Sequence, residues 1–393
     1  MTQAGKLPYW RLSAFYFCHF AVMGALVPYL PAYLAQLGLA PAQIGSLMAI
    51  HMGMRLISPN IWGYVADRRG QILSTIRWGA ALAAFSFLGM FGTHDVLHLA
   101  WVIGLFSFFW HACLPPFEAL TLSYLGAAGH RYPLVRLWGS VGFIATVAGF
   151  GAFGERAIAY LPYVLAPLFF AIWAAACQVP AVAVRVKGEV STSFLQVLRQ
   201  PPVLGFLTTC FLLNLSHGPY YTFFTLYLQA LGYRQQLIGG LWAWAVLAEV
   251  GLFVLLPRLR RRWQPRALFL GALGLTVLRW VLIAILARYP LALILAQALH
   301  AASFAVCHAM AVGYIQQFFS PAQQGRAQGL YSSVAFGGGS ALGSLVSGFL
   351  WPYGGGFVIY LGAAGVAWVA LVLAWLSLPP AHPQQASGLT RAA

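Results

Sequence analysis

Apolar runs of about twenty residues recur along almost the whole chain, and this pattern confines its fold to a lipid bilayer. Residues 296–315 form one such run, and a helix that spans a membrane needs about 20 apolar residues. Only 7% of the residues are charged, whereas 61% are hydrophobic, and the mean hydropathy is +0.78. Because 393 residues leave room for about twelve spans with short loops, we predict an all-α membrane protein with twelve transmembrane helices.

Proline, glycine and charged residues divide the apolar runs and set the expected helix boundaries. The first run is long and rich in glycine and proline, so we expect a retained helix and not a cleaved signal peptide. The basic stretch 258–262 is expected to be a loop. The twelve expected helices cover residues 9–37, 41–65, 72–92, 97–124, 131 onward, 158–184, 203–231, 237–256, 267–287, 291–319, 321–350 and 355–378.

The positive charges are distributed unevenly between the loops. The net charge is +16, and most Lys and Arg residues fall in alternate loops, while only Arg156, Arg234 and Arg288 fall in the others. An excess of Lys and Arg marks the cytoplasmic loops of membrane proteins. We therefore expect a multi-pass protein of the bacterial cytoplasmic (inner) membrane with both termini in the cytoplasm, and we do not expect nucleic acid as a partner.

The five cysteines predict neither disulfides nor a metal site. All of them lie in apolar runs without C-x-x-C spacing, which is typical of small packing residues. They are Cys18, Cys113, Cys177, Cys210 and Cys307. We expect no metal, no cofactor and no enzymatic activity.

An internal repeat divides the chain into two halves. Tyr33-Leu34 and Ile44-Gly45 recur as Tyr227-Leu228 and Ile238-Gly239 at an offset of 194 residues. We predict two pseudo-symmetric six-helix bundles, with a binding site between them near the middle of the membrane. The expected boundaries are 1–184 for the first bundle, 185–200 for a cytoplasmic linker, 201–380 for the second bundle and 381–393 for a disordered tail.

Isolated charges inside the apolar runs are the candidate functional residues. A charge at the centre of a span costs about 2.5 to 3.5 kcal/mol on insertion scales and persists where it is paired or faces water. Glu249, Arg279 and His300 lie in three successive spans, so we expect one polar cluster. A lone histidine is more often a satisfied core residue. The nearby charges favour a role for His300, whereas both interpretations stay open for His308.

The first half carries a second candidate pair. Glu118 follows Pro115-Pro116 in mid-span, and Arg136 lies near the start of the next span, so we expect the two to pair across a short cytoplasmic turn. His111 lies seven residues before Glu118 and is expected on the same helical face.

A charged loop follows the second span. Residues 63–70 read G-Y-V-A-D-R-R-G, which resembles the signature loop G-x-x-x-D-R-x-G of the major facilitator superfamily, although Gln71 and Ile72 replace the basic pair usual downstream. The resemblance implies the two-bundle fold of that superfamily. It also implies a gate in which Asp67 and Arg68 take part, with Asp67 paired in one conformation and released in the other. A simple topology anchor is the alternative.

A closer resemblance covers nearly the whole chain. Pro115-x-x-Glu118-Ala119, followed by Arg136-x-x-Gly139-x-x-Gly142-Phe143, is similar to the lactose permease group of oligosaccharide–proton symporters. The second half looks closer to the 3-phenylpropionate permeases, a sister group, at Gly240-Leu241-Trp242, Ala248-Glu249-Val250, Leu278-Arg279-Trp280, Leu299-His300 and Val306-Cys307-His308.

We expect two sets of site residues, and the resemblance implies Glu118 and Arg136 in the first set and Glu249, Arg279 and His300 in the second. Substrate binding is expected at Glu118, Arg136, Ser140, Phe143, His111 and Trp242. Proton coupling is expected at Glu249, Arg279, His300 and His308.

The chain departs from the lactose group at its chemical centre. Ser303 stands where that group has the proton-carrying glutamate, and Gln297 replaces a nearby lysine. We therefore expect Glu249 to carry the proton, since burial favours a neutral carboxyl and a neighbouring arginine favours a charged one. Phe143 replaces the sugar-stacking tryptophan, which disfavours a sugar. Arg136 instead suits a carboxylate, which a guanidinium binds through a bidentate fork.

The repeat also relates Arg55 to Glu249, at the same offset of 194 residues. We expect these two residues to approach each other across the interface in one state and to separate in the other, which assigns Arg55 to gating. Arg55 shares a helical face with His51 and Ser58. A charge that reaches toward the membrane surface is the alternative.

The expected function is proton-coupled uptake of a small organic substrate, such as an aromatic carboxylate, by alternating access. A sugar or nucleoside symporter is one alternative, and a drug–proton antiporter is another. A sensor that binds without transporting is a third. The expected partners are a small-molecule substrate, protons and the lipid bilayer, and we expect the protein to act as a monomer.

Overall fold

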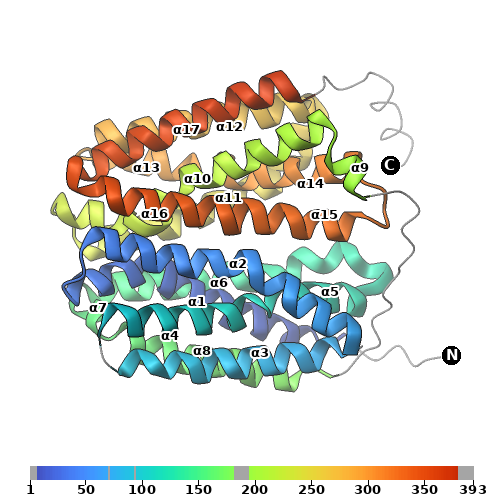
Figure 1. Cartoon of the computed structure of the whole chain (residues 1–393), viewed down its shortest axis with the longest axis horizontal. Helices are drawn as coiled ribbons and strands as arrows, with labels where there is room; N and C mark the ends of the chain where they lie inside the picture. The colour runs from blue at the N-terminus through green and yellow to red at the C-terminus, as the bar shows by residue number, and fades with distance from the viewer. Residues whose placement is uncertain (1–6, 70, 93, 181–193, 379–393) are drawn as a thin grey trace.

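The computed structural model describes residues 7–69, 71–92, 94–180 and 194–378, and helices make up almost all of this part of the chain. These ranges contain no strand. The helices form two halves that lie one above the other in Figure 1, with the first half in blue to green and the second in yellow-green to red. The all-α architecture predicted from the apolar runs is confirmed.

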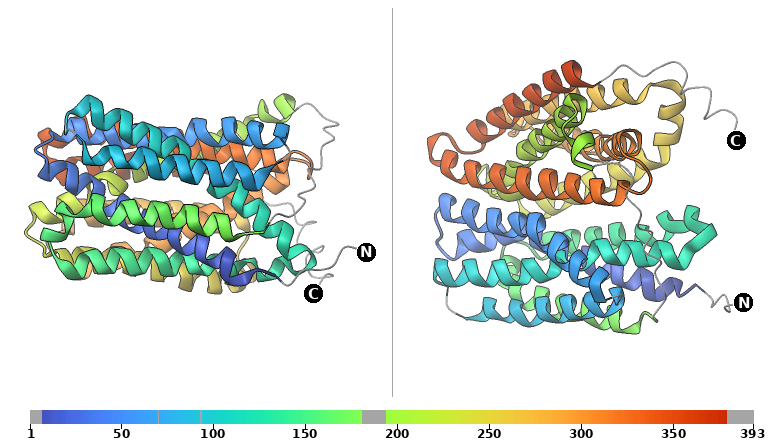
Figure 2. Two further views of the ribbon diagram at one scale, coloured as in Figure 1. Left: turned by 90° about the horizontal axis from the view of Figure 1, so that it is seen from below. Right: turned by 45° about the vertical axis from the view of Figure 1, so that its right-hand side comes forward.

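The first half is a bundle of long helices that run lengthwise beside one another (Figures 1 and 2). The helix α1 lies between helices of both halves, because it packs against α6 and α8 of its own half and against α10 of the other. The elements of this half are α1 (Tyr9–Gln36), α2 (Pro41–Arg69), α3 (Ile72–Phe87), η1 (Leu88–Phe91), α4 (Val96–His111), α5 (Leu114–Leu125), η2 (Gly126–Arg131), α6 (Tyr132–Phe153), α7 (Arg156–Ala159) and α8 (Leu161–Gln178).

The second half repeats this pattern of long helices. Two of its spans contain π-helical turns, η3 and η4, a feature that is frequent at functional sites. The elements are α9 (Phe194–Leu198), α10 (Pro201–Ala230), α11 (Gln235–Arg262), α12 (Pro265–Leu286), α13 (Pro290–Ala298), η3 (Ala302–Val306), α14 (Cys307–Phe318), α15 (Gln324–Tyr331), η4 (Ser332–Gly339), α16 (Ser340–Leu350), η5 (Trp351–Tyr353) and α17 (Gly355–Ser377).

Ten helices in the described part of the chain are long and apolar enough to cross a membrane. The helices α2 and α10 are also long enough, with 29 and 30 residues, but neither contains an 18-residue stretch apolar enough to be counted among the ten. The helix α2 packs against α16 and η4 of the other half, and α10 packs against α1, so protein covers much of their surface. With these two helices, the described chain has the twelve expected spans.

Several boundaries differ from the expected ones. The fourth span is divided between α4 and α5, because Pro115 and Pro116 have no N–H group with which to continue the helix. The prediction of a loop at 258–262 is wrong, since α11 continues to Arg262, and cations near a helix C-terminus interact favourably with its dipole. Part of the expected linker forms α9, while 185–193 and the expected tail 381–393 lie outside the described residues.

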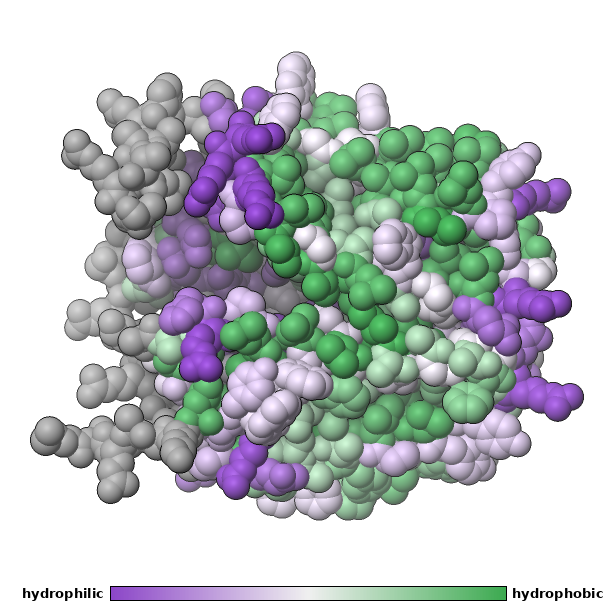
Figure 3. All heavy atoms as spheres, turned by 180° about the vertical axis from the view of Figure 1, so that it is seen from behind, coloured by the Kyte–Doolittle hydropathy of each residue, from purple (hydrophilic) through white to green (hydrophobic). Residues whose placement is uncertain are grey.

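The two halves enclose a hollow on one side of the molecule. The helix α1 begins and α17 ends on that side (Figure 1). Figure 3 shows the surface hollowed there between the halves, with hydrophilic side chains along the rim. The chain therefore has an open side and an opposite, far side.

Glycines hold the halves together on the far side. A Cβ added to Gly45 of α2 would lie 2.8 Å from the Cα of Gly348 of α16, and one added to Gly239 of α11 would lie 2.8 Å from the Cα of Gly151 of α6. Gly45 and Gly239 are the glycines that the internal repeat relates, so the two crossings are pseudo-equivalent. Only glycine permits helices to approach this closely.

The glycine run of η4 forms a third close crossing. A Cβ on Gly337 would lie 2.7 Å from the backbone nitrogen of Leu56 in α2, and one on Gly339 would lie 2.5 Å from the carbonyl oxygen of Phe211 in α10. This contact brings the middle of α2 directly against the second half.

Candidate functional site

Glu249 and His300 are in direct contact in the second half. Glu249 is on α11 and His300 lies just before η3, and their Oε1 and Nε2 atoms are 2.7 Å apart. Their side chains are 14% and 7% exposed. The other ring nitrogen of His300, Nδ1, is buried without a hydrogen-bond partner among the described residues. The two side chains are therefore close enough to share one proton, and both are almost buried.

Arg279 of α12 is completely buried and is held by hydrogen bonds instead of by a carboxylate. Its Nε donates to the carbonyl oxygen of Ala296, Nη1 donates to Ser303 Oγ, and Nη2 donates to Gln297 Oε1, each at 3.1 Å. The rings of Tyr220 and Trp280 lie 4.3 Å from its guanidinium carbon. These contacts occupy the guanidinium on both its edges and its faces.

Two of the residues that depart from the lactose group, Ser303 and Gln297, are thus partners of Arg279. Ser303 Oγ accepts from Arg279 and donates to the carbonyl oxygen of His300 at 3.1 Å, so it connects Arg279 to the Glu249–His300 pair. Gln297 accepts from Arg279 and donates to Tyr220 Oη at 3.1 Å. The expected cluster of Glu249, Arg279 and His300 exists, but no ion pair joins Glu249 to Arg279.

The π-helical turn η3 aligns three rings along the tenth span. His300 stacks on Phe304 with ring centroids 5.7 Å apart, and Phe304 stacks on His308 at 6.2 Å. In a regular α-helix, residues four apart drift around the axis, and the extra residue of a π-turn corrects this drift. Regular helical periodicity would place His308 on the flank of the His300 face, whereas the π-turn places it in line with His300.

His308 also contacts the eleventh span. Its Nδ1 lies 3.2 Å from Tyr331 Oη, and its ring is 5.9 Å from that of Phe336. His308 therefore has no direct contact with the Glu249–His300 pair, and Phe304 separates them.

Glu118 and Arg136 pair in the first half, as their positions on α5 and α6 predicted. The distance from Arg136 Nε to Glu118 Oε1 is 3.8 Å, and the side chains are 30% and 38% exposed, respectively. The guanidinium carbon of Arg136 lies 3.8 Å from the ring centroid of Phe20 and 5.7 Å from that of Tyr16. This single long contact leaves the pair accessible and loosely held.

Arg55 lies at the interface between the halves. Its guanidinium carbon is 5.0 Å from the ring centroid of Phe336 on η4, and its side chain is half-buried. It has no hydrogen bond and no ion pair with any described residue. Glu118 and Tyr221 lie within electrostatic range of it. Arg55 and Glu249 are not paired with each other in this state.

The charged groups of the two halves lie within electrostatic range of one another. Glu249 of the second half lies within electrostatic range of Arg136 of the first, and Arg55 lies within range of both Glu118 and residues of the second half. The hollow of Figure 3 opens between the same two halves.

The remaining expected substrate residues have different surroundings. Trp242 is only 3% exposed, donates its indole N–H to Thr225 Oγ1 at 3.1 Å and packs on Tyr220, so it belongs to the packed core in this state. Phe143 is buried, while Ser140 is half-buried one turn above Arg136 on α6.

His111 does not extend the face of Glu118. It ends α4, and its Nε2 donates to the carbonyl oxygen of His51 on α2 at 3.2 Å. The break between α4 and α5 removes the regular helical spacing on which that expectation depended.

Of the two expected gating residues at the end of α2, the structure describes the side chain of Arg68 but not that of Asp67. The side chain of Asp67 lies outside the described residues. Arg68 is exposed at the end of α2, and its Nη1 donates to Tyr64 Oη at 3.0 Å.

Aromatic partners of the charges are the residues that the sequence did not single out. Phe20 and Phe336 lie against Arg136 and Arg55, and Phe304 lies between the two histidines. Aromatic residues are abundant in this chain, so the sequence does not distinguish these three. The packing of the helices shows which rings contact the charged groups.

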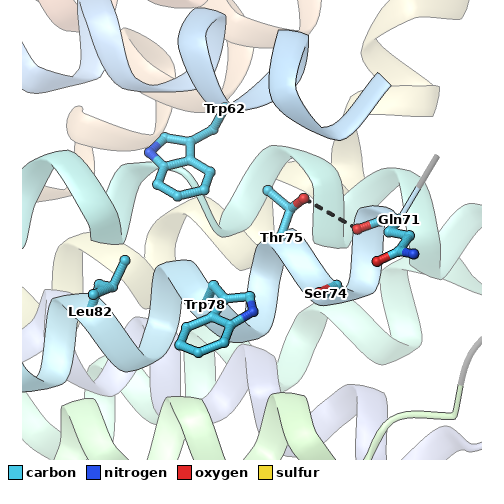
Figure 4. A pocket seen from close by; sticks show the side chains of 6 residues that line it. All are labelled: Trp62, Gln71, Ser74, Thr75, Trp78 and Leu82. Atoms are coloured by element: carbon cyan, nitrogen blue, oxygen red, sulfur yellow. Dashed lines mark hydrogen bonds between the residues drawn. The ribbon is translucent and has the colours of Figure 1, made fainter. Parts of the chain in front are cut away.

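A small pocket lies apart from these charges, between α2 and α3. Its volume is about 230 Å³, and Figure 4 shows the side chains that line it, with Thr75 donating to the carbonyl oxygen of Gln71 at 3.2 Å. They are Trp62, Gln71, Ser74, Thr75, Trp78 and Leu82. None of these side chains is a charged or acid–base group, so this pocket is not the candidate site.

Comparisons with known proteins agree with this fold. The model of the MFS_1 like family matches residues 9–361. The probable 3-phenylpropionic acid transporter of Escherichia coli K12 is 32% identical over 382 residues, covering 92% of this chain and 94% of that protein. The maltose permease of Geobacillus stearothermophilus is 27% identical, covering 88% of this chain and 89% of that protein.

Solved transporter structures share the fold. A mutant form of the nucleoside transporter NupG has a TM-score of 0.82 at 18% identity, covering 94% of this chain and all of that one. The POT family transporter PepTSo has a TM-score of 0.75 at 12% identity, covering 96% of this chain and 98% of that one. The chain therefore belongs to the MFS_1 like family and is a multi-pass membrane transporter of the major facilitator type, not an enzyme.

Proposed function

We propose that this transporter carries a small aromatic monocarboxylate into the cell together with a proton. The observation that supports this proposal most strongly is the balance of charges inside the spans. The described interior holds three arginines and two glutamates: Arg55, Arg136, Arg279, Glu118 and Glu249. With both glutamates ionised, one positive charge is left over.

An excess positive charge in the middle of a membrane is unfavourable, and a bound monoanion would neutralise it. A neutral sugar or nucleoside would leave the charge uncompensated, and a cationic drug would increase it. The charge balance thus favours an organic anion over the other substrate classes.

The surroundings of the charges suit an aromatic body. Phe20, Phe304 and Phe336 lie beside Arg136, His300 and Arg55, respectively. The relative that is 32% identical is described as a probable 3-phenylpropionic acid transporter, whose substrate combines a phenyl ring with one carboxylate. We propose the same substrate class here.

We propose that the Glu249–His300 pair carries the proton. The two groups are close enough to share one proton, and His300 Nδ1 has no other partner among the described residues. Arg279 is linked to the pair through Ser303, so a shift of the tenth span would change the electrostatic surroundings of the pair. Proton binding can thereby depend on the conformation of the protein.

We propose that the open side faces the cytoplasm, in the inner membrane, and that the far side opens during the cycle. The excess of positive charge in alternate loops supports this orientation. Alternating access then requires the glycine crossings of the far side to separate while the open side closes. Asp67 and Arg68 would act at the closing side.

A ligand panel tests the substrate class. Melting temperatures of the purified protein are measured with 3-phenylpropionate, its neutral amide, maltose and a nucleoside, since a ligand that binds only the folded state raises the melting temperature. The proposal predicts a shift with the carboxylate alone, and counterflow of that compound in liposomes. A shift with maltose or the nucleoside and none with the carboxylate would contradict it.

A further inference from the structure

We infer that Arg55, and not Arg136, binds the carboxylate of the substrate, with the aromatic body of the substrate lying against Phe336 and Phe304. This inference rests on the proposed function, since it requires an aromatic monocarboxylate as substrate. It assigns to Arg55 a specificity-determining role in place of the gating role that the internal repeat suggested. Three arginines lie inside the spans, and their surroundings distinguish them.

Arg279 is not available to a substrate. It is completely buried, and its Nε, Nη1 and Nη2 already donate to Ala296, Ser303 and Gln297. Two rings cover its faces at 4.3 Å. A carboxylate could reach it only after these contacts had broken.

Arg136 is accessible, but Glu118 already balances its charge. The two side chains are 3.8 Å apart. A substrate carboxylate bound to Arg136 would lie next to the carboxylate of Glu118, and two anions this close repel each other. Phe20 further covers one face of the Arg136 guanidinium at 3.8 Å.

Of these three arginines, Arg55 is the one whose guanidinium makes neither a hydrogen bond nor an ion pair with a described residue. Its side chain is half-buried, and no hydrogen bond or ion pair to a described residue occupies its guanidinium. An unpaired cation at this depth costs free energy, and binding an anion there would relieve this cost. The planar guanidinium can hold a carboxylate through two parallel hydrogen bonds.

The backbone of Arg55 is held firmly in place. Gly337 of η4 packs directly on Leu56, with a distance of 2.7 Å from its hypothetical Cβ to the Leu56 nitrogen. One turn further along α2, Asn60 Nδ2 donates to Ser333 Oγ of η4 at 3.2 Å. A binding residue on such a rigid contact loses little freedom when the substrate binds.

An aromatic wall lies next to Arg55. Phe336 is in contact with Arg55, and it meets Phe304 edge-to-face with centroids 6.1 Å apart and Tyr331 at 5.7 Å. Phe304 and Phe336 are both half-buried, so part of each ring is free to contact a ligand. A phenyl ring would add to this arrangement at an edge or a face, as aromatic rings prefer.

The test compares two single variants, Arg55→Gln and Arg136→Gln, for binding of 3-phenylpropionate and of its neutral amide to the purified protein. Losing a charge-assisted contact should raise the Kd of the carboxylate at least about tenfold in Arg55→Gln. The Kd of the amide should change less than about twofold, because it carries no charge to be recognised. In Arg136→Gln, the carboxylate should be affected less than in Arg55→Gln.

A further variant at the same position distinguishes loss of the binding contact from loss of the fold. Arg55→Lys keeps the charge but loses the planar fork, so it should bind the carboxylate more weakly than the wild type and more tightly than Arg55→Gln. An unchanged Kd in Arg55→Gln with a loss in Arg136→Gln would overturn the inference while leaving the proposed function intact. Failure of the wild type to bind any aromatic carboxylate would overturn both.

Discussion

The two halves of the molecule hold their interior charges in opposite ways. In the first half, Glu118 and Arg136 are about one-third exposed and joined by a single contact of 3.8 Å. In the second half, Arg279 is fully buried and makes three hydrogen bonds of 3.1 Å. A sealed, hydrogen-bonded charge can stabilise one arrangement of helices, whereas an accessible charge can exchange partners. On our proposal, the first half supplies the substrate contacts and the second half the proton chemistry.

Arg55 and Glu249 show the same contrast at related positions. The repeat offset of 194 residues places them at corresponding points of α2 and α11. Glu249 has a partner in His300 at 2.7 Å, while Arg55 has only the ring of Phe336. Pseudo-symmetry therefore places both residues near the middle of their helices, and we propose that one place serves a proton and the other an anion.

The largest expected effect is on stability, and it tests whether the charge of the second half is structural. Arg279→Gln leaves Gln297 and Ser303 without their buried donor and should lower the free energy of unfolding by about 3 kcal/mol or more. Arg136→Gln is the matched control in the accessible pair, and its cost should stay below about 1 kcal/mol. Thermal unfolding in detergent measures both. Equal losses in the two variants would remove the contrast between the halves.

The next effect concerns the movement of one half against the other. A side chain at Gly239 would meet the backbone of Gly151, whereas neighbouring Gly240 has no atom within 4 Å of its hypothetical Cβ. Gly239→Val should therefore lower the transport rate at least about tenfold, because the far side can no longer close. Gly240→Val should stay within about twofold of the wild type. Uptake into liposomes checks both rates, and equal rates would show that this crossing is not part of the cycle.

The coupling variant separates the two carboxylates. Glu249→Gln should retain substrate exchange but lose accumulation driven by a pH gradient, which for one proton per anion is about tenfold per pH unit. Glu118→Gln should instead change substrate binding and keep the accumulation ratio. If Glu249→Gln still accumulates substrate, another group must carry the proton.

The smallest effect tests whether Trp242 belongs to the site or to the core. Trp242→Phe removes the hydrogen bond to Thr225 and should lower the free energy of unfolding by about 1 kcal/mol, while KM changes less than about twofold. Thermal unfolding and uptake kinetics measure the two quantities. A large change in KM with unaltered stability would place this ring in the substrate path.

The sequence predicted the spans, the repeat and the charged residues because lipid tolerates few exceptions. Apolar runs of sufficient length must be helices. Charges such as Glu249 and Arg279 are costly inside them unless they are paired or face water, so they stand out as candidate functional residues. Sequence position alone did not predict the partners of these charges. The link from Arg279 to Ser303 and Gln297 depends on how three helices pack.

The π-turns explain the remaining differences. Helical periodicity places His308 beside the face of His300, and the extra residue within η3 rotates His308 into line with it. In the same way, η4 carries Phe336 over Arg55, a contact that regular spacing does not reveal. Periodic patterns therefore identified the helices, but they did not predict which side chains share a face where a π-turn interrupts the α-helix.

The most direct test of electroneutral symport is uptake of 3-phenylpropionate into liposomes that contain the purified protein, under a pH gradient alone and under a membrane potential alone. One proton moving with one monoanion transfers no net charge, so the potential, which acts at about 2.3 kcal/mol per charge per 100 mV, should have no effect. Accumulation that follows the pH gradient and ignores the potential is the predicted result. Accumulation that follows the potential, or uptake that never exceeds equilibrium under a pH gradient, would contradict it.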